Sequence, residues 1–368
     1  MGFQVSVQPS QHGFQAQPEE TILDAALRQG LCLPYGCRDG VCGSCRGKVL
    51  SGQVTHGKAG LDVLSEADRD AGYALFCCAM ARSDLDIESR EVRSLEDIPI
   101  RTLPARVHSL TRAAPDVMII KLKLPASDRL QFLAGQYVDI LLREGKRRAF
   151  SIANAPHEDA FLELHVRHMP GGQFTGQVFS TMKERDLLRL RGPQGSFFLR
   201  SDSPKPMLLV AGGTGFAPIK AIVHQAIAEG DERPMAVYWG GRQLADLYLL
   251  ELAQQWPAQH PNLRFVPVLS DAPADEHWNG RHGLVHQAAM ADHPDLSGYQ
   301  AYVCGSPAMV AAAREDFLTR CHLPAEEFFA DSFDFASDTL AAIDTLHPSD
   351  RKVDPYEIPP QNLSLLRE

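Results

Sequence analysis

The sequence predicts a multidomain protein of mixed class, with an α+β domain, then an antiparallel β-barrel, then a parallel α/β domain. Three observations lead to this prediction. The chain has 368 residues, which is enough for two or three separate cores. Short strands separated by glycine and proline fill residues 105–200. From Pro206 onward, apolar strands alternate with helices.

Residues 1–93 are expected to form the first domain around a small mixed sheet. Apolar and polar residues alternate over residues 3–9, and His12-Gly13 is a turn signal, so the chain is expected to open with a hairpin. Residues 48–54 predict a second hairpin, and residues 84–88 predict a strand that closes the sheet.

One helix is predicted between these two hairpins. Thr21 followed by Asp24 three residues later is an N-terminal capping pattern, and Ile22 begins a run with helical spacing. Gly30 is placed to end this helix.

The remaining residues divide into a linker, two domains and a tail. Residues 94–104 are charged and interrupted by proline, which is typical of a linker. Residues 105–203 are expected to form the barrel and residues 204–336 the α/β domain, whereas residues 337–368 are a tail without a fixed role. The expected strands span 117–124, 137–142, 161–167, 187–191, 207–211, 235–238, 264–268 and 302–304, and the expected helices span 219–229, 247–255 and 308–321.

The composition is that of an ordinary globular protein, with 44% hydrophobic and 22% charged residues. No apolar run reaches the roughly eighteen residues of a membrane span, so a membrane partner is not expected. The net charge of −10 argues against nucleic acid as a partner and is compatible with a cationic protein partner or simply with solubility. No leader is recognised, so a cytoplasmic location with reduced thiols is expected.

Four cysteines have the spacing of a [2Fe–2S] ligand set. Cys37, Cys42 and Cys45 follow the pattern C-x4-C-x2-C, and a fourth thiol lies downstream at Cys77 or Cys78. A zinc ribbon would need a second C-x2-C pair, which the sequence lacks, and a disulfide framework is unexpected in a reducing compartment. The spacing therefore predicts one-electron chemistry at an iron–sulfur cluster.

The choice between the two adjacent cysteines depends on a resemblance. Residues 74–84 resemble the plant-type ferredoxin segment in which a ligand cysteine lies six residues before a Ser-Asp pair, here Ser83-Asp84. This resemblance implies that Cys77 is the fourth ligand and that Cys78 is a small buried residue. It also implies a β-grasp ferredoxin fold for residues 1–93.

The stretch that begins at Arg148 carries a second resemblance. Arg148-Ala149-Phe150-Ser151 is similar to the Arg-x-Tyr-[Ser/Thr] motif with which the ferredoxin–NADP reductase superfamily holds a flavin. The resemblance implies that Arg148 pairs with phosphate, that Phe150 covers the flavin ring and that Ser151 hydrogen-bonds its reactive edge. Phenylalanine in place of tyrosine keeps the stacking surface and loses a hydroxyl.

Four more residues lie where that superfamily continues its flavin contacts. They are His165 and Arg167 in one strand, followed by Gly172 and Thr175, with the glycine allowing backbone amides to approach a pyrophosphate. A glycine turn between two barrel strands is the alternative interpretation of the second pair.

A glycine-rich turn follows the first strand of the α/β domain. Gly212, Gly213, Thr214 and Gly215 lead into a helix whose first turn contains Pro218. Glycines allow close approach, and a helix N-terminus offers free N–H groups, so this turn predicts a dinucleotide site. The Gly-Gly-Thr-Gly-x-Ala-Pro pattern is also the one that the superfamily carries.

Two later segments resemble the nicotinamide side of the same superfamily. Cys304-Gly305 lies at the end of another expected strand, where the superfamily has a cysteine near the hydride path, and Phe333 is the candidate aromatic against the flavin. Ser151 and Cys304 are therefore the candidate catalytic residues. Without the resemblance, Cys304 would be interpreted as a buried structural thiol and Phe333 as a core aromatic.

Together these motifs resemble the reductase components of bacterial ring-hydroxylating oxygenases and, equally, reductases of the CDP-6-deoxy-glucoseen type that serve a deoxysugar dehydrase. The resemblance implies electron transfer from NADH through FAD and a [2Fe–2S] cluster to a partner protein, with a terminal oxygenase as the first expectation. NADH is expected rather than NADPH because Asp271 would repel an additional phosphate, although NADPH remains an alternative. A redox-sensing interaction protein is the alternative of another class, and a free-flavin reductase is disfavoured because it needs no cluster.

Overall fold

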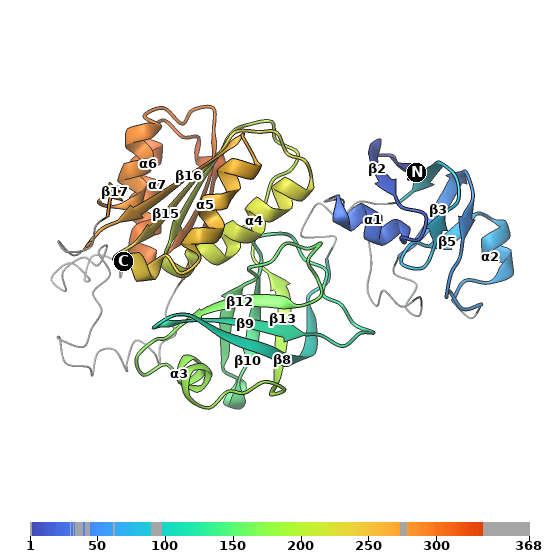
Figure 1. The fold of residues 1–368 in the computed structure, drawn as a ribbon, viewed down its shortest axis with the longest axis horizontal. Helices are drawn as coiled ribbons and strands as arrows, with labels where there is room; N and C mark the ends of the chain where they lie inside the picture. The colour runs from blue at the N-terminus through green and yellow to red at the C-terminus, as the bar shows by residue number, and fades with distance from the viewer. Residues whose placement is uncertain are drawn as a thin grey trace.

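The computed structural model describes residues 2–29, 31, 33, 40, 45–61, 63–89, 98–272 and 278–333, which form three domains (Figure 1). The first domain lies at one end of the molecule, and the barrel and the α/β domain lie against each other. The side-chain amide of Gln131 in the barrel domain donates a hydrogen bond of 3.0 Å to the carbonyl of Leu33 in the first domain. The expected multidomain class is confirmed.

The first domain has a mixed sheet with strand order β2-β1-β7-β3-β5. Strand β1 pairs antiparallel with β2 and parallel with β7, so the closing strand lies at the centre of the sheet. The apolar residues of these strands and of α1 share one core. The elements are β1 (Phe3–Gln8), β2 (His12–Ala16), α1 (Ile22–Arg28), β3 (Arg46–Ser51), β4 (Val54–Thr55), α2 (Glu66–Asp70), β5 (Tyr73–Leu75), β6 (Met80–Ala81) and β7 (Leu85–Glu88).

The start of α1 is as predicted. The backbone N–H of Asp24 donates to the side-chain oxygen of Thr21 over 3.1 Å, which satisfies one of the free donors of the first turn. Gly30, the predicted end of the helix, lies outside the described residues, and the helix is capped at Gln29.

Two turn predictions in this domain are wrong. His12 and Gly13 belong to β2, where they pair with Val7 and Ser6, so the hairpin turn comes earlier in the chain. The second predicted hairpin does not form, because β3 pairs with β5 and β7 whereas β4 pairs with β6. Gly52, at φ +96°, redirects the chain between β3 and β4.

The second domain is an antiparallel sheet with strand order β11-β10-β13-β8-β9-β12. The two outer strands meet, because Ile152 bridges Leu164 and the N–H of Ala153 donates to the carbonyl of Glu163 over 2.8 Å. The sheet therefore closes into the predicted barrel. Its elements are β8 (Arg101–Ala114), β9 (Val117–Lys123), β10 (Tyr137–Leu141), β11 (Arg147–Ser151), β12 (Leu162–Arg167), α3 (Gln173–Ser180) and β13 (Leu187–Gln194).

Strand β8 begins at Arg101, within the segment expected to be a linker. Residues 101–105 of this strand pair with β13 and not with β9, so this part of β8 has one open side. Pro104 lies in this part, where a missing N–H is tolerated. The proline thus interrupts the hydrophobic pattern without interrupting the strand.

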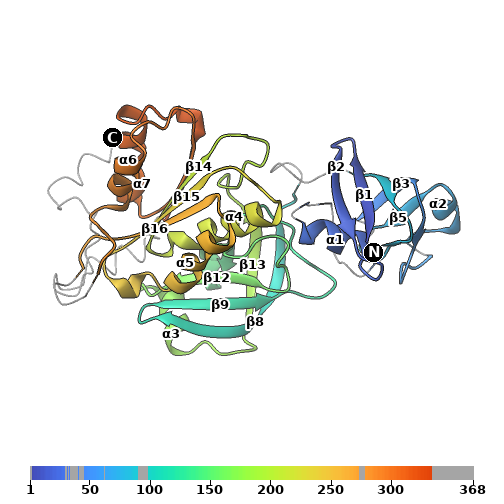
Figure 2. The ribbon, with the colours of Figure 1, turned by 45° about the horizontal axis from the view of Figure 1, so that its top comes forward.

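The third domain has a parallel sheet with strand order β17-β16-β15-β14-β18-β19. Leu209 and Ala211 of β14 pack with α4 and α5, whereas Leu208 and Val210 pack with α6 and α7 on the opposite face (Figures 1 and 2). The elements are β14 (Met207–Gly212), α4 (Phe216–Ala228), β15 (Met235–Gly241), η4 (Leu244–Asp246), α5 (Leu250–Gln259), β16 (Leu263–Leu269), β17 (Arg281–His282), α6 (Val285–Asp292), β18 (Gln300–Gly305), α7 (Pro307–Thr319) and β19 (Phe328–Ser332).

The strand order reverses between β14 and β18. From β14 the chain proceeds through β15, β16 and β17 in one direction and then crosses to β18 and β19 on the other side. Ligands of open parallel sheets bind at the carboxyl ends of the strands at such a reversal. The predicted glycine turn follows β14, and the predicted cysteine, Cys304, lies at the carboxyl end of β18. Among the described residues, no helix combines the length and the apolar composition that crossing a membrane requires.

Candidate functional site

Two of the four predicted cluster ligands are described, and the fold brings them together. Cys45 and Cys77 are both buried, and a hydrogen bond between their side chains is the first of the contacts that lower the pKa of Cys77. The side chain of Cys78 and the backbone N–H of Gly40 lower that pKa further, while burial opposes them. Thiolates with an N–H directed at sulfur are the donor set that a [2Fe–2S] cluster requires. The other two ligands, Cys37 and Cys42, lie outside the described residues.

The adjacent thiol of Cys78 has a different environment. Its Sγ is 3.6 Å from that of Cys77 and packs beneath Gly40, where an added Cβ would be only 2.7 Å from it. Gly40 also has φ +78°. Cys78 therefore packs against the turn at Gly40, and Cys77 as the fourth ligand stays a prediction.

In the barrel, strand β11 presents two of the predicted flavin residues, Arg148 and Phe150, on the same side. Arg148 and Phe150 are half-buried, whereas Ala149 between them is exposed. The ring of Phe150 lies 5.3 Å from that of Phe174 in α3, at an interplanar angle of 48°. The strand thus offers a guanidinium and an aromatic surface on one side, a combination that fits a flavin nucleotide.

Helix α3 begins directly beside this strand, with Gly172 as its N-cap residue. The side-chain oxygen of Thr175 accepts the N–H of Met169 over 3.1 Å and donates to the carbonyl of Met169 over 3.2 Å. A Cβ on Gly172 would lie 2.6 Å from that oxygen, so a larger residue there would have to displace the Thr175 hydroxyl. The interpretation of this stretch as a turn between two strands is wrong, because a helix follows it.

His165 in β12 is fully enclosed by protein groups. Its Nε2 lies 3.0 Å from Oε1 of Glu163, and its Nδ1 lies 2.8 Å from the hydroxyl of Tyr248 in the third domain. Burial lowers the pKa of His165, so the ring is neutral near pH 7. Nε2 then donates to the carboxylate, and Nδ1 accepts from Tyr248. Both ring nitrogens of His165 are thus already hydrogen-bonded to protein groups, and neither is available for the predicted contact with a flavin.

Arg167, two residues further along β12, faces the glycine turn of the third domain. Its Nη1 lies 3.3 Å from Asp116 and 3.2 Å from Asp246. Its Nη2 is buried and has no hydrogen-bond partner among the residues that the structure describes. A Cβ on Gly213 would lie 3.3 Å from this atom. A half-buried guanidinium with a spare, buried donor at a glycine turn fits the phosphates of a dinucleotide.

The glycines of the turn between β14 and α4 have separate structural causes. Gly213 has φ +52°. A Cβ on Gly215 would lie 2.1 Å from the carbonyl oxygen of Cys304, and one on Gly212 would lie 2.5 Å from Sδ of Met309. These two glycines therefore allow the turn to pack against β18 and α7.

The N-terminus of α4 follows this turn, and Thr214 lies half-buried within the turn. No side-chain hydrogen bond caps the helix at Gly215, and the N–H of Phe216, its first residue, donates to the carbonyls of Gly213 and Thr214. The positive end of the helix dipole at this turn favours an anion. Pro218 is buried in the first turn of α4, as expected, and lacks an N–H that the helix would not use there.

The carboxyl ends of β18 and β19 meet the end of β11. The hydroxyl of Ser151 donates to Oδ2 of Asp331 over 3.2 Å, and Asp331 is the register partner of Cys304. The N–H of Phe333 donates to the carbonyl of Gly305 over 2.9 Å. Both candidate catalytic residues, Ser151 and Cys304, thus lie at one junction between the two domains.

Asp331 is a site residue that the sequence analysis missed. It lies two residues before Phe333, in a stretch that the resemblance had already singled out. Its contact with Ser151 joins residues 180 positions apart, and a local sequence pattern does not predict a contact over that separation. Burial, and then the charge of Asp331, raise the pKa of Cys304, so its thiol is neutral near pH 7.

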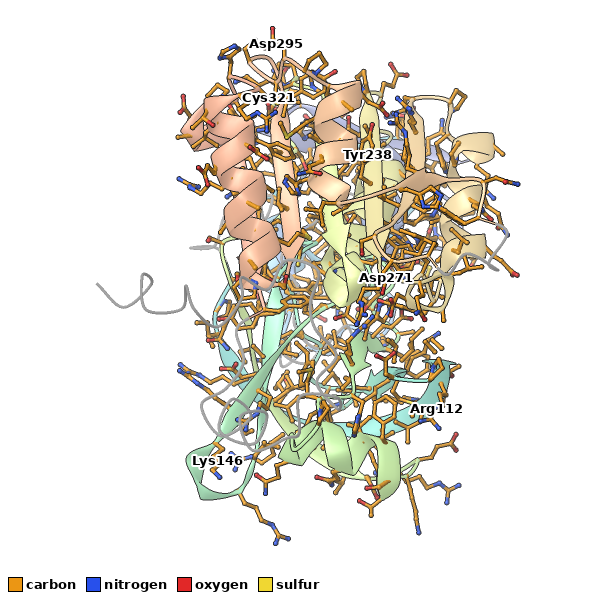
Figure 3. The ribbon with its side chains drawn as sticks, turned by 90° about the vertical axis from the view of Figure 1, so that its left-hand side faces the viewer. Arg112, Lys146, Tyr238, Asp271, Asp295 and Cys321 are labelled. Atoms are coloured by element: carbon orange, nitrogen blue, oxygen red, sulfur yellow. The ribbon has the colours of Figure 1, made fainter. Side chains whose placement is uncertain are left out.

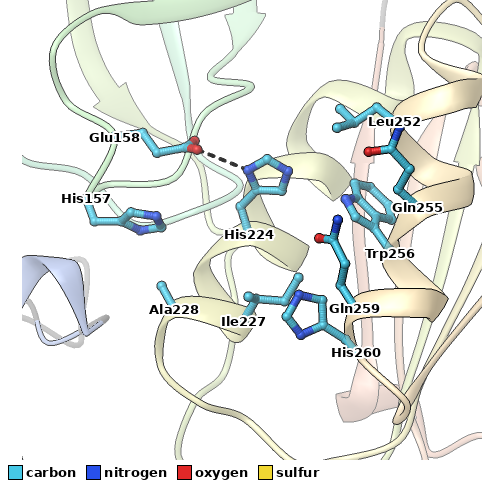
Figure 4. A pocket seen from close by; sticks show the side chains of 10 residues that line it. All are labelled: His157, Glu158, His224, Ile227, Ala228, Leu252, Gln255, Trp256, Gln259 and His260. Atoms are coloured by element: carbon cyan, nitrogen blue, oxygen red, sulfur yellow. Dashed lines mark hydrogen bonds and ion pairs between the residues drawn. The ribbon is translucent and has the colours of Figure 1, made fainter.

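A cavity of about 380 Å³ lies away from this junction, over the later turns of α4 and α5 (Figure 4). At its edge, Nδ1 of His224 on α4 lies 3.2 Å from Oε1 of Glu158 in a barrel loop. None of the predicted site residues lines this cavity.

Comparison with known protein families gives three matches, which follow one another along the chain in the same order as the three domains. Residues 5–82 match the family described as a 2Fe-2S iron-sulfur cluster binding domain. Residues 104–199 match an oxidoreductase FAD-binding domain, and residues 209–315 match an oxidoreductase NAD-binding domain.

Among curated proteins, the chain is 41% identical over 333 residues to the CDP-6-deoxy-L-threo-D-glycero-4-hexulose-3-dehydrase reductase of Yersinia pseudotuberculosis, covering 90% of this chain and 99% of that protein. It is 37% identical over 336 residues to a terephthalate 1,2-dioxygenase reductase component of Comamonas, covering 90% of this chain and 98% of that protein.

Among solved structures, an Amycolatopsis cytochrome P450 reductase is 38% identical with a TM-score of 0.61, covering 91% of this chain and 100% of the other. The ferredoxin reductase in carbazole 1,9a-dioxygenase is 27% identical with a TM-score of 0.58, covering 91% and 99%. The cofactor sites, the domain matches and these relatives agree, and the chain belongs to the NAD(P)H-dependent iron–sulfur flavoprotein reductases.

Proposed function

We propose that this protein carries electrons from NADH to a partner protein and that the junction of Ser151, Cys304 and Asp331 is where the coenzyme meets the flavin. The observation that carries the proposal is the hydrogen bond of 3.2 Å from Ser151 of the barrel to Asp331 of the α/β domain. It joins the predicted flavin strand to the carboxyl edge of the parallel sheet, where the strand order reverses.

The residues of the chain hold and orient the cofactors. FAD supplies the exchange between a two-electron hydride and single electrons, and the [2Fe–2S] cluster supplies one-electron transfer. Arg148, Phe150 and the start of α3 would hold the flavin nucleotide. Arg167 and the N-terminus of α4 would bind the phosphates of the coenzyme. The buried hydroxyl of Ser151 would orient the flavin edge, because Asp331 fixes its direction.

NADH is the proposed coenzyme because of an ion pair at the edge of the third domain that faces the barrel (Figure 3). Nη2 of Arg242, after β15, lies 3.1 Å from Oδ2 of Asp271, after β16. The carboxylate would repel a 2′-phosphate, and it also engages the arginine that would otherwise attract one. Steady-state rates with both coenzymes test this assignment, and a clear preference for NADPH would contradict it.

Two classes of acceptor protein are supported. The similarity to a deoxysugar dehydrase reductase, at 41% identity over nearly its whole length, favours a dehydrase. The similarity to a dioxygenase reductase component, at 37% identity over nearly its whole length, favours the terminal oxygenase expected from the sequence. A cytoplasmic location belongs to the same proposal, because the ligand cysteines require a reducing compartment. So does the absence of a nucleic-acid partner, because the net charge is −10.

The test is an anaerobic single-turnover experiment with the cofactor-loaded protein. NADH should bleach the flavin absorbance, and the electron paramagnetic resonance signal of a reduced [2Fe–2S] cluster should follow. Adding a purified dehydrase or a terminal oxygenase then identifies the acceptor that reoxidises the cluster. Asp331→Asn should slow flavin bleaching, whereas an unchanged bleaching rate would remove the junction from the proposal.

The alternative of a redox-sensing interaction protein predicts a different outcome. A sensor loaded with all its cofactors would reduce neither ferricyanide nor cytochrome c with NADH at an enzymatic rate. Reduction of both at rates of about 1 per second or more would exclude it.

A further inference from the structure

Lys220 is a buried charge that the described sites do not use. It lies on α4, one turn after the glycine-rich turn, and its side chain is 8% exposed. Its Nζ donates to the carbonyl of Ala153 over 3.0 Å and lies 3.3 Å from Oε1 of Glu163. Both partners belong to the barrel, so this side chain crosses the boundary between two domains.

The two partners of Lys220 lie beside the predicted flavin residues, Ala153 just after the end of β11 and Glu163 within β12. Ala153 comes two residues after Ser151, and Glu163 comes two residues before His165. A backbone hydrogen bond of 2.8 Å from the N–H of Ala153 to the carbonyl of Glu163 ties these strands together. One ammonium group therefore holds both strands at the point where the barrel closes.

The other end of the contact is the helix of the coenzyme site. The N-terminus of α4 follows Gly212–Gly215, and α4 is continuous from there through Lys220. A second tie lies one turn later, where His224 of α4 pairs with Glu158 of the barrel over 3.2 Å (Figure 4). Tyr248 and Asp246 add contacts to β12 from the same domain. The helix that receives the coenzyme is thus joined to the barrel by two polar contacts of its own, of which the one made by Lys220 is buried.

We propose that Lys220 is a positioning residue for hydride transfer, which fixes the coenzyme-binding helix at its working distance from the flavin-binding strands. This inference rests on the proposed function. Lys220 does not touch the junction of Ser151 and Cys304, so it acts through the placement of α4 and not on the reacting atoms. Displacement of bound reactants by about 1 Å can slow a reaction about 100-fold.

A purely structural role is the competing explanation, because removing one partner of a buried ion pair leaves the other charge uncompensated. The double variant Lys220→Met with Glu163→Gln separates the two explanations. It removes the uncompensated carboxylate and so should recover thermal stability, but it does not restore the link from α4 to Ala153.

Lys121→Met is the matched control. Its Nζ lies 3.7 Å from Oε2 of the same Glu163, but its side chain is 46% exposed and comes from β9 of the barrel. The Lys121→Met variant therefore removes a positive charge beside the same carboxylate, but it leaves the contacts between α4 and the barrel in place. Its rate of flavin reduction should match that of the wild type within about threefold.

The measurement is the rate of flavin bleaching by NADH in anaerobic stopped flow. Lys220→Met and the double variant should both be slower by about 10- to 100-fold at saturating NADH, with coenzyme affinity changed less than about threefold. The long-wavelength charge-transfer absorbance between nicotinamide and flavin should weaken in both. A wild-type rate in Lys220→Met, or recovery of the rate together with stability in the double variant, would overturn the inference. A wild-type protein that NADH does not reduce would instead overturn the proposed function.

Discussion

The sulfur atoms of Cys77 and Cys78 are neighbours in different environments. Cys77 receives hydrogen bonds from Cys45 and from the N–H of Gly40, whereas Cys78 packs beneath Gly40. Cys77→Ser should therefore lower NADH-dependent cytochrome c reduction by about 100-fold or more, because even changes outside the ligand set cost roughly 10- to 100-fold. Flavin bleaching by NADH should persist.

Cys78→Ser is the control for this prediction, since it changes the adjacent sulfur in the same core. It should keep the reduced-cluster signal in electron paramagnetic resonance. If the signal were lost in Cys78→Ser and kept in Cys77→Ser, the ligand assignment would be reversed.

The pair of Arg242 and Asp271 makes a second prediction for single residues. Asp271→Ala removes the repulsive carboxylate and releases Arg242, so the ratio of kcat/KM for NADH to that for NADPH should fall by about tenfold, which corresponds to about 1.4 kcal/mol. Steady-state kinetics with both coenzymes measures the ratio. Adding Arg242→Ala to this variant should abolish the gain with NADPH, and an equal gain without the arginine would contradict the mechanism.

At the scale of elements, two glycines with different surroundings allow a matched test. Gly215→Ala should destabilise the third domain by about 1–3 kcal/mol, because its new Cβ would lie 2.1 Å from the carbonyl oxygen of Cys304. Gly176→Ala in α3 meets no atom within 4 Å and should stabilise by about 0.5–1 kcal/mol through helix propensity. Thermal unfolding of both variants measures the difference, and equal melting temperatures would show that the glycine turn tolerates a Cβ.

The elements themselves were largely predictable. The strands and helices around Gly212–Gly215 were found because buried parallel strands are apolar throughout and their helices keep a regular spacing. Helix α3 was missed because it is short and because its N-cap Gly172 and its residue Thr175 had been assigned to cofactor contacts by the resemblance. The prediction of a second hairpin was wrong because strand pairing depends on where the chain turns. At Gly52 the chain changes direction, so β4 does not pair with β3.

The candidate site was predictable only where a motif is local. Cys45 and Cys77 come together in the fold, and Ser151 and Cys304 each adjoin Asp331, whereas their roles in cofactor binding stay predictions. The enclosure of His165 between two domains could not be read from the sequence, since it depends on a tyrosine 83 positions away. A contact such as that between His165 and Tyr248 forms only when the barrel packs against the α/β domain.

For the whole molecule, the buried contacts between the barrel and the α/β domain predict a dependence on pH. Burial raises the pKa of Glu163, but the hydrogen bond from His165 and the charge of Lys220 lower it by more. The net effect is a pKa of about 2 in place of 4.5. Burial also lowers the pKa of His165 from its usual 6.5. Because both shifts are downward, the unfolded chain binds more protons, and stability falls as the pH falls.

The loss should begin below about pH 6.5 with His165 and continue between about pH 4.5 and pH 2 with Glu163. Thermal unfolding of the cofactor-loaded protein as a function of pH tests this expectation. Glu163→Gln should be less stable than the wild type at pH 7 and show a flatter decline below pH 4.5. Parallel curves for the two proteins would show that this carboxylate does not link acid to stability.

The closure of the barrel has a consequence for the order of assembly during synthesis. The strands that meet at Ala153 and Glu163 are held by Lys220, which belongs to the next domain. A ribosome-bound chain that ends before α4 can form this closure with Lys121 beside Glu163, but it lacks Lys220, the buried one of the two lysines that face this carboxylate. The barrel is therefore expected to reach its final stability only after α4 has emerged, which makes flavin retention by the nascent protein a late event.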